Sequence, residues 1–352
     1  MNKLNKNILT DRWDSDCFPD KETALRICKD TKILTKYIPH PFSGHRPLPN
    51  QKLSTIETNE NGWRSPSVIN KKFKKNIILL GGSAAWGFGA TSNKQIPSYL
   101  IEKILFNKYE LEYNVINLAE QMYSSFEELQ SFVSYADELT PSAVICLSGF
   151  NDSAQAYHNV FKINIMQTRW TKFCLWSLKI GLLNENNFFK KIFKILIRSY
   201  KKKFIFNENY YVTKKPKKKE IAVNLFENKV AWISSYCKNM NIPVAFFLQP
   251  DLHFKKNKSL HEKNYLNTFN YSNDLNVFKP EQSESIVQSL LAIESKFFKN
   301  PLNDKNQLFC SLLDVFSNFK HTIHIDRVHF SDEGNKIIAD QICTKITKRF
   351  DL

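Results

Sequence analysis

The sequence predicts an α/β fold, a three-layer α/β/α sandwich with a mostly parallel, flavodoxin-like sheet. Two observations predict it. From residue 76 onward, short runs of apolar residues alternate with longer amphipathic segments, which is the pattern of strands joined by crossover helices. The short runs are apolar throughout rather than alternating with polar residues, as expected when helices cover both faces of a sheet.

The elements follow one another along the chain. Strands are predicted at 76–80, 115–118, 143–148 and 243–248, and helices at 97–105, 125–139, 220–240 and 331–346. Three local signals support the helix ends. Pro97 suits a first helical turn, and Thr140-Pro141 ends a helix. Ser331 is expected to be an N-cap, because acidic residues follow it in the first turn.

Two segments depart from this alternation. Residues 1–70 contain five scattered prolines after residue 38 and little periodicity, which predicts an irregular N-terminal extension on a main domain spanning 71–352. Residues 154–219 form an aromatic, lysine-rich insertion that includes Lys201–Lys203. We expect a helical cap with a solvated lysine loop there. The alternative is an amphipathic surface that makes weak contact with anionic lipid.

The composition argues against a specific nucleic-acid-binding function and bears on the cellular location. The formal charge is +16, yet 42 lysines stand against 8 arginines. This ratio indicates compositional bias more than a specific nucleic-acid site, because base and phosphate contacts depend largely on arginine. The 7 cysteines form no C-x-x-C pair, and no apolar segment opens the chain. We therefore expect a reducing, cytoplasmic location, with peripheral membrane contact through 154–219 as the alternative.

Chemically useful side chains lie next to three of the predicted elements. Ser83 comes directly after the strand at 76–80 and two glycines, where a hydroxyl can be exposed on a tight turn. Asn151 follows the strand at 143–148. Asp326 and His329 stand three apart before the final helix, close enough for the carboxylate to orient the imidazole. Each signal alone is weak, but carboxyl ends of parallel strands gather at one edge of a sheet.

The order of these blocks resembles the SGNH (GDSL-type) hydrolase superfamily. The matching blocks are Gly81-Gly82-Ser83, Asn117-Leu118-Ala119, Gly149-Phe150-Asn151-Asp152 and Asp326-Arg327-Val328-His329. The resemblance covers about residues 75–152 and 220–346 and implies a catalytic triad of Ser83, His329 and Asp326. It also implies an oxyanion hole made by the backbone N–H groups of Ser83 and Ala119 and the side chain of Asn151.

Two positions depart from the usual family pattern. Gly82 stands where the name-giving motif has Asp, and Ala119 stands where the second block has Gly. The first departure resembles a bacterial subgroup with GGS starts, often preceded by a stretch like Asn59–Arg64. The second is compatible with a backbone donor as long as Ala119 does not require a positive φ.

These features predict a serine esterase acting through an acyl-enzyme on Ser83, without metal or cofactor. The expected substrate is an O-acyl ester, such as an acetyl group on a bacterial glycan or a related small molecule. Two alternatives remain open at this point: transfer of the acyl group to a sugar hydroxyl, and a catalytically weak module that binds a glycan or partner. The sequence does not indicate the oligomeric state.

Other candidates are weaker. His321 and His324 suggest a metal site only faintly, because no third ligand accompanies them, and His324 is a second candidate for the base. Gln249-Pro250-Asp251, after the strand at 243–248, is a candidate stretch of pocket lining, with an ordinary strand-ending turn as the alternative. Trp63 and Arg64 are more typical of residues that attach the extension to the core than of residues that bind a sugar or carboxylate.

Overall fold

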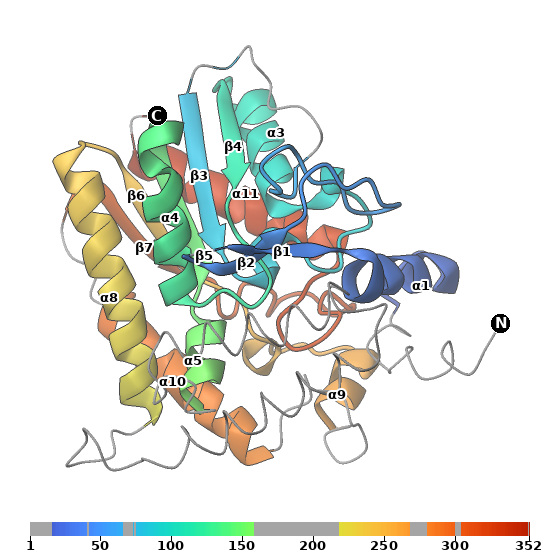
Figure 1. Ribbon diagram of the computed structural model, residues 1–352. Coiled ribbons are helices and arrows are strands. Elements are labelled where there is room, and N and C mark those ends of the chain that lie inside the picture. Colours follow the sequence, from blue (N-terminus) through green and yellow to red (C-terminus); the bar gives the residue numbers. More distant parts are fainter. Residues whose placement is uncertain are drawn as a thin grey trace, which may run out of the picture.

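A parallel sheet lies at the centre of the molecule (Figure 1). The computed structural model describes residues 16–40, 42–65, 73, 75–157, 218–267, 280–299, 304–350 and 352. Within them, five parallel strands pair in the order β4–β3–β5–β6–β7. Their bounds are Lys75–Gly81 (β3), Tyr113–Asn117 (β4), Pro141–Ser148 (β5), Val244–Leu248 (β6) and Gln307–Ser311 (β7). This order is the flavodoxin-like 2-1-3-4-5, so the predicted fold class is confirmed.

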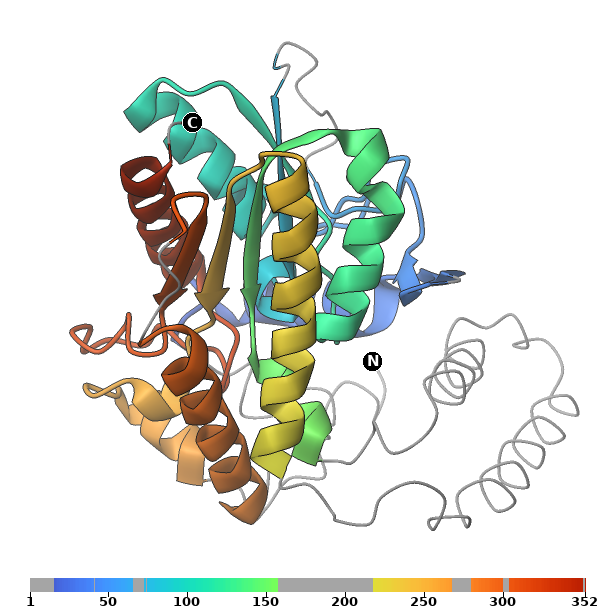
Figure 2. The same cartoon turned by 90° about the vertical axis from the view of Figure 1, so that its left-hand side faces the viewer.

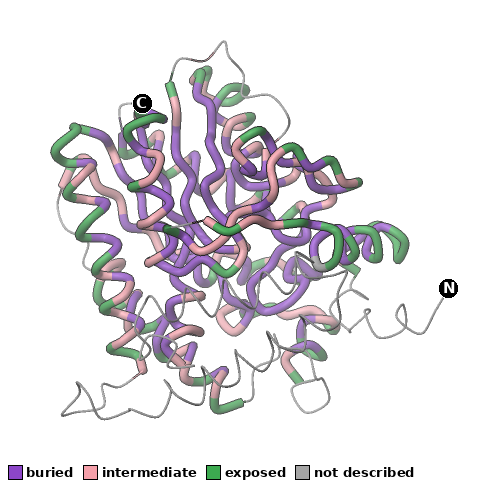
Figure 3. Tube along the Cα trace, viewed as in Figure 1, coloured by how far each residue is buried: buried purple, intermediate pink, exposed green. Residues whose placement is uncertain are grey.

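Helices cover both faces of the sheet (Figure 2). Alternate side chains of β3 enter two separate cores: Ile77 and Leu79 face one, Ile78 and Leu80 the other, because successive strand residues point to opposite faces. Strands β3, β4, β5 and β6 are buried along nearly their whole length, whereas β7 is only partly buried (Figure 3). The first core is closed by α1 (Lys21–Lys29), α3 (Pro97–Tyr109) and α11 (Asp332–Arg349). The second is closed by α4 (Ser125–Leu139), α5 (Phe150–Tyr157), α8 (Lys218–Asn239) and α10 (Pro280–Phe297).

All of the predicted strands and helices are present, and the structure also contains elements that were not predicted. Helix α4 has the predicted bounds, and the Ser331 side chain accepts the Gly334 N–H as the N-cap of α11. Strand β7 and helix α10 were not predicted. Within the described residues after position 75, the other short elements are α2 (Ser83–Trp86), α9 (Leu260–Asn267) and 3-10 turns at Asn93–Gln95 and Leu252–Phe254.

The N-terminal segment is more regular than predicted. It contains α1, a π-helical turn at Asp30–Leu34, and an antiparallel hairpin of β1 (Tyr37–His40) and β2 (Gly44–Pro47). The expectation of an irregular extension is therefore wrong for this part. The Asp20 side chain caps α1 by accepting the Thr23 N–H at 2.6 Å, a local signal that starts a helix without long periodicity.

Several expectations concern residues that lie outside the described ranges. They include most of the insertion at 154–219, with Lys201–Lys203, so its helical and membrane interpretations stay predictions, as does the domain boundary at residue 70. In the described part of the chain, no helix combines the length and apolar character needed to cross a bilayer.

Candidate active site

Ser83 lies on a tight turn at the carboxyl end of β3. It is the first residue of α2, with Gly82 as the N-cap and Gly87 ending the helix in the left-handed region at φ 87°. The Ser83 side chain is half-buried, and its backbone N–H has no hydrogen-bond partner among the described residues. The turn therefore presents both a hydroxyl and an unused N–H donor at the sheet edge where ligands bind in this class of fold.

The predicted histidine and aspartate join this serine. His329 Nε2 lies 2.7 Å from Ser83 Oγ, and His329 Nδ1 lies 2.7 Å from Asp326 Oδ2. The other carboxylate oxygen accepts the backbone N–H groups of Val328 and His329 at 2.9 and 3.0 Å. Because a carboxylate only accepts, Nδ1 carries the proton and Nε2 accepts from the serine hydroxyl.

The surroundings of the imidazole fix its plane. His329 is 8% exposed and Asp326 1% exposed. Phe88 stacks on the imidazole with ring centroids 4.0 Å apart. A ring held between an aromatic face and a buried carboxylate has little rotational freedom, so the proton-accepting nitrogen stays aimed at Ser83.

The Asn151 side chain extends from the start of α5 to the turn that carries Ser83. Its Nδ2 donates to the carbonyl oxygen of Tyr123 at 2.7 Å, which leaves the second N–H of the amide for another acceptor. The carboxamide also lies directly over Gly82, because a Cβ added to that glycine would be 2.4 Å from Nδ2. Gly82, the first departure from the family pattern, is thus the residue that makes room for Asn151.

The N–H of Ala119, the second predicted backbone donor, is occupied. The backbone φ of Ala119 is not positive, so the second departure causes no strain. However, its N–H donates to the Asn117 side chain at 3.2 Å, and Asn117 Nδ2 donates to the Arg64 carbonyl at 3.3 Å. Of the three predicted oxyanion donors, two are available in this arrangement: the Ser83 N–H and the Asn151 amide.

The Arg64 side chain contacts the end of α2, the short helix that begins at Ser83. Its guanidinium is 1% exposed and donates to the carbonyl of Gly87, to Asn93 Oδ1 at 3.1 Å and to the Thr55 carbonyl at 3.0 Å. It also lies 4.4 Å from the ring centroid of Trp86. Arg64 therefore attaches the N-terminal segment to α2, in agreement with the structural interpretation of this residue and not with a ligand-binding one.

A buried acid stands next to Ala119. Glu120 is 3% exposed, and burial raises its pKa to about 8, opposed by the Gln121 backbone N–H and the charge of Arg64. Burial likewise lowers the pKa of Arg64 to about 9. Glu120 also lines a small cavity of about 10 Å³ with residues of the β1–β2 hairpin, which is room for about one water molecule.

The alternative histidines lie elsewhere. His324 is buried between Phe316 and Phe330, and neither ring nitrogen has a hydrogen-bond partner in the described part of the chain. Burial lowers the pKa of His324 to about 4, which favours the neutral ring. His321 pairs with Glu333 at the surface, 2.9 Å apart. Within the described residues no three metal-binding side chains gather.

Asp251 is fully buried and belongs to a second Ser–His–Asp arrangement. His253 Nδ1 lies 2.9 Å from Asp251 Oδ1, and His253 Nε2 lies 2.9 Å from Ser283 Oγ. Arg327 joins them, with Nε 2.7 Å from Asp251 Oδ2 and Nη1 2.9 Å from Ser283 Oγ. The serine oxygen is thus already occupied by a cation, and Ser283 is buried. This constellation is missing from the sequence analysis; its one signal is an arginine inside the Asp-x-x-His block.

Comparison with known proteins gives structural likeness only. No family model matches the sequence, and no curated protein matches it significantly. Among solved structures, an acetyl xylan esterase has a TM-score of 0.41 at 14% identity, covering 77% of this chain and 99% of that one. An acetylxylan esterase from Geobacillus stearothermophilus, solved as a catalytic mutant, has 0.41 at 12%, covering 78% and 94%. A lipase/acylhydrolase from Enterococcus faecalis has 0.39 at 12%, covering 78% and 96%.

Proposed function

We propose that the protein is a serine ester hydrolase of the SGNH (GDSL-type) superfamily. One observation carries the proposal: Ser83 Oγ, the His329 ring and Asp326 form a continuous hydrogen-bonded chain with both links at 2.7 Å. A nucleophile bonded to a base, which is in turn oriented by a buried carboxylate, is the arrangement required for acyl transfer through a covalent intermediate.

The chemistry follows from these positions. Ser83 Oγ attacks the ester carbonyl carbon while its proton passes to His329 Nε2, and Asp326 stabilises the imidazolium. The Ser83 N–H and the free N–H of Asn151 stabilise the negative oxygen of the tetrahedral intermediate. The C–O bond to the alcohol then breaks, and His329 returns the proton to the leaving alkoxide. Water, deprotonated by the same imidazole, releases the acid from the acyl-enzyme.

For the substrate we propose a small O-acyl ester, such as an acetyl group on a glycan or a related small molecule. The resemblance of the Gly81–Ser83 block to GGS starts supports this class. Ser83 is half-buried, which also favours an ester with a short acyl group over an ester flanked by bulky chains on both sides.

A fluorophosphonate probe and a panel of p-nitrophenyl esters test the proposal. Wild-type protein should be labelled and should hydrolyse short-chain esters, whereas Ser83→Ala should lose both properties. Ser134→Ala, which changes a serine on the outer helix α4 bonded to the Gln130 carbonyl, should retain both. An unlabelled wild type with turnover equal to Ser83→Ala would refute the function. Adding a sugar acceptor and measuring the ratio of acid to new ester distinguishes hydrolysis from transfer.

A further inference from the structure

We propose that Arg327 is a positioning residue of the active site: its buried guanidinium holds the turn that carries Asp326 and His329. The inference rests on the proposed function, since it assigns a role toward the Ser83–His329–Asp326 triad. Arg327 is in the turn between the two triad residues, yet its side chain is bonded to Asp251 and Ser283.

The side chain of Arg327 is part of a closed ring of hydrogen bonds. Arg327 donates to Asp251 and to Ser283. Because Asp251 is held as a carboxylate, with its pKa depressed well below the usual range mainly by the charge of Arg327 against the effect of burial, His253 Nδ1 must be the donor in their contact. His253 Nε2 then accepts from the Ser283 hydroxyl, whose oxygen accepts from Arg327. With a neutral imidazole, every bond in the ring has one donor and one acceptor.

The ring is connected to the triad through the backbone. The Leu252 N–H donates to the Arg327 carbonyl at 2.9 Å, so the segment after β6 holds Arg327 by both its side chain and its main chain. Asp326 Oδ1 accepts the N–H groups of the two residues after Arg327, which makes 326–329 one rigid turn. A displacement of Arg327 is therefore transmitted to Asp326 and to the imidazole.

Arg327 also contacts the segment that carries the oxyanion donor. Its guanidinium carbon lies 5.3 Å from the ring centroid of Phe150, the residue before Asn151. The same side chain is thus in contact with both parts of the site that must keep their separation: the base turn and the start of α5. A side chain in this position can fix the distance between the base turn and the start of α5 without taking part in the reaction itself.

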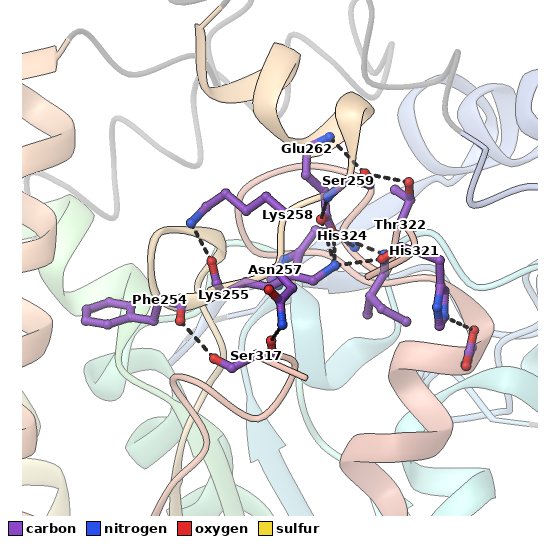
Figure 4. Close-up of polar contacts among 12 residues, drawn as sticks. Phe254, Lys255, Asn257, Lys258, Ser259, Glu262, Ser317, His321, Thr322 and His324 are labelled. Carbon is purple, nitrogen blue, oxygen red and sulfur yellow. Dashed lines mark hydrogen bonds and ion pairs between the residues drawn. The ribbon is translucent and has the colours of Figure 1, made fainter. Parts of the chain in front are cut away.

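A second buried ion pair, Lys255–Glu262, holds residues 321–324, which precede Asp326 in the chain (Figure 4). Lys255 Nζ lies 2.7 and 2.6 Å from the two carboxylate oxygens of Glu262 and donates to the His321 carbonyl at 2.7 Å. Glu262 accepts the N–H groups of Ile323 and His324, both at 3.1 Å. Residues 251–262 therefore hold the loop at 321–324 and again at Arg327, on both sides of Asp326.

The choice of charged groups favours a geometric role. Buried ion pairs contribute little net stability compared with apolar residues of similar size, because two charges must leave water. A guanidinium, however, presents its donors in a fixed planar fork and so sets direction as well as distance. Asp251 and Arg327 are both almost completely buried, so the ring is best explained by the geometry that it imposes on the turn.

The test separates positioning from general stability. We would compare wild type with Ser283→Ala, Arg327→Met and the paired Asp251→Leu/Arg327→Met, which leaves no uncompensated buried charge. For each, kcat and KM with p-nitrophenyl acetate, urea unfolding, and the low-field proton resonance of His329 Nδ1 would be measured. We expect kcat to fall by about 100-fold in both arginine variants, since misplacement by about 1 Å has that effect, with KM changed less than threefold and the resonance shifted or lost. Ser283→Ala, which folds most readily, should show a smaller change in the same direction.

Lys229→Met is the matched control. It removes another fully buried ion pair, Lys229–Glu128 at 2.9 Å between α8 and α4, and should lower stability without moving the His329 resonance. The inference is overturned if the arginine variants and Ser283→Ala keep the wild-type kcat and resonance, or if Lys229→Met shifts the resonance as much as they do. The resonance does not require turnover. An active Ser83→Ala would therefore refute the proposed function, while the resonance would still decide the role of Arg327.

Discussion

Replacing Gly82 tests the geometry of the oxyanion site most directly. A Cβ at this position would lie 2.4 Å from Asn151 Nδ2 and 3.1 Å from the Tyr123 carbonyl oxygen. The backbone of Gly82, at φ −88° and ψ −156°, is open to other residues. The conflict therefore comes from contact and not from backbone strain. Since the nearest atom is the end of a flexible side chain, Asn151 should move aside.

The expected effect is large on catalysis and small on stability. Displacing one oxyanion donor lowers kcat by about 10²–10³-fold, or about 2.7–4 kcal/mol of transition-state stabilisation. The free energy of unfolding of Gly82→Ala should stay within about 1 kcal/mol of wild type. Alanine lowers the conformational entropy of the unfolded chain relative to glycine, and this stabilisation offsets part of the cost of moving Asn151. Gly82→Asp, which introduces the residue of the GDS motif, should be worse than Gly82→Ala because it adds a negative charge beside the developing oxyanion.

The assay is hydrolysis of p-nitrophenyl acetate in a double-mutant cycle with Asn151→Ala. If Gly82→Ala acts through the carboxamide, it should lower kcat about 100-fold in the wild-type background and less than about threefold once Asn151 has been removed. Equal losses in both backgrounds, or a Gly82→Asp variant as active as wild type, would refute the reasoning. Urea unfolding of each variant shows that the comparison concerns folded protein.

Three further predictions concern the surrounding residues. Asp326→Asn should lower kcat by about 10⁴-fold by favouring the wrong tautomer of His329, with probe labelling slowed to a similar degree; an effect below tenfold would contradict the role of Asp326. Arg64→Met should destabilise the fold by about 1–3 kcal/mol, as measured by urea unfolding, because it removes the donor to the buried Thr55 carbonyl and one of the two donors to the Gly87 carbonyl; an unchanged midpoint would contradict this. Glu120→Gln tests the buried acid by thermal unfolding. The unfolded chain loses the Glu120 proton near pH 4.5 and the folded protein near pH 8, so wild-type stability falls between these values. The Tm difference in favour of Glu120→Gln should grow from pH 5 to pH 8.5, and a constant difference would contradict the raised pKa.

Local signals explain which parts of the fold could be predicted. Helix α4 has the predicted bounds, because a capping box of Ser124 and Glu127 starts it and Thr140-Pro141 ends it. Strand β7 was missed because its residues are only partly buried and its pattern is mixed. The hairpin of β1 and β2 was missed because its strands contain Pro39 and Pro47, which argue against strands when taken alone.

The site shows the same division. Ser83, Asn151, Asp326 and His329 each follow or precede a recognisable element, and the rule for carboxyl ends of strands then brings them together. The partners of Arg327 could not be predicted, since Asp251 lies 76 residues away in sequence and Ser283 44. Nor does any pattern reveal that Asn117 occupies the Ala119 N–H, because that contact depends on one side-chain rotamer.

The hydrogen bond between Ser83 and His329 joins residues 246 positions apart. At about 5–20 residues per second of synthesis, the serine is incorporated roughly 12–50 s before its base. Throughout that interval β3 and its neighbours can begin to pair, yet the nascent chain contains a hydroxyl with nothing to take its proton. Under the proposed function, hydrolysis starts only once the turn at 326–329 has formed and brought His329 to Ser83. A translation product that stops before this turn would be inert toward esters, however well its sheet had formed.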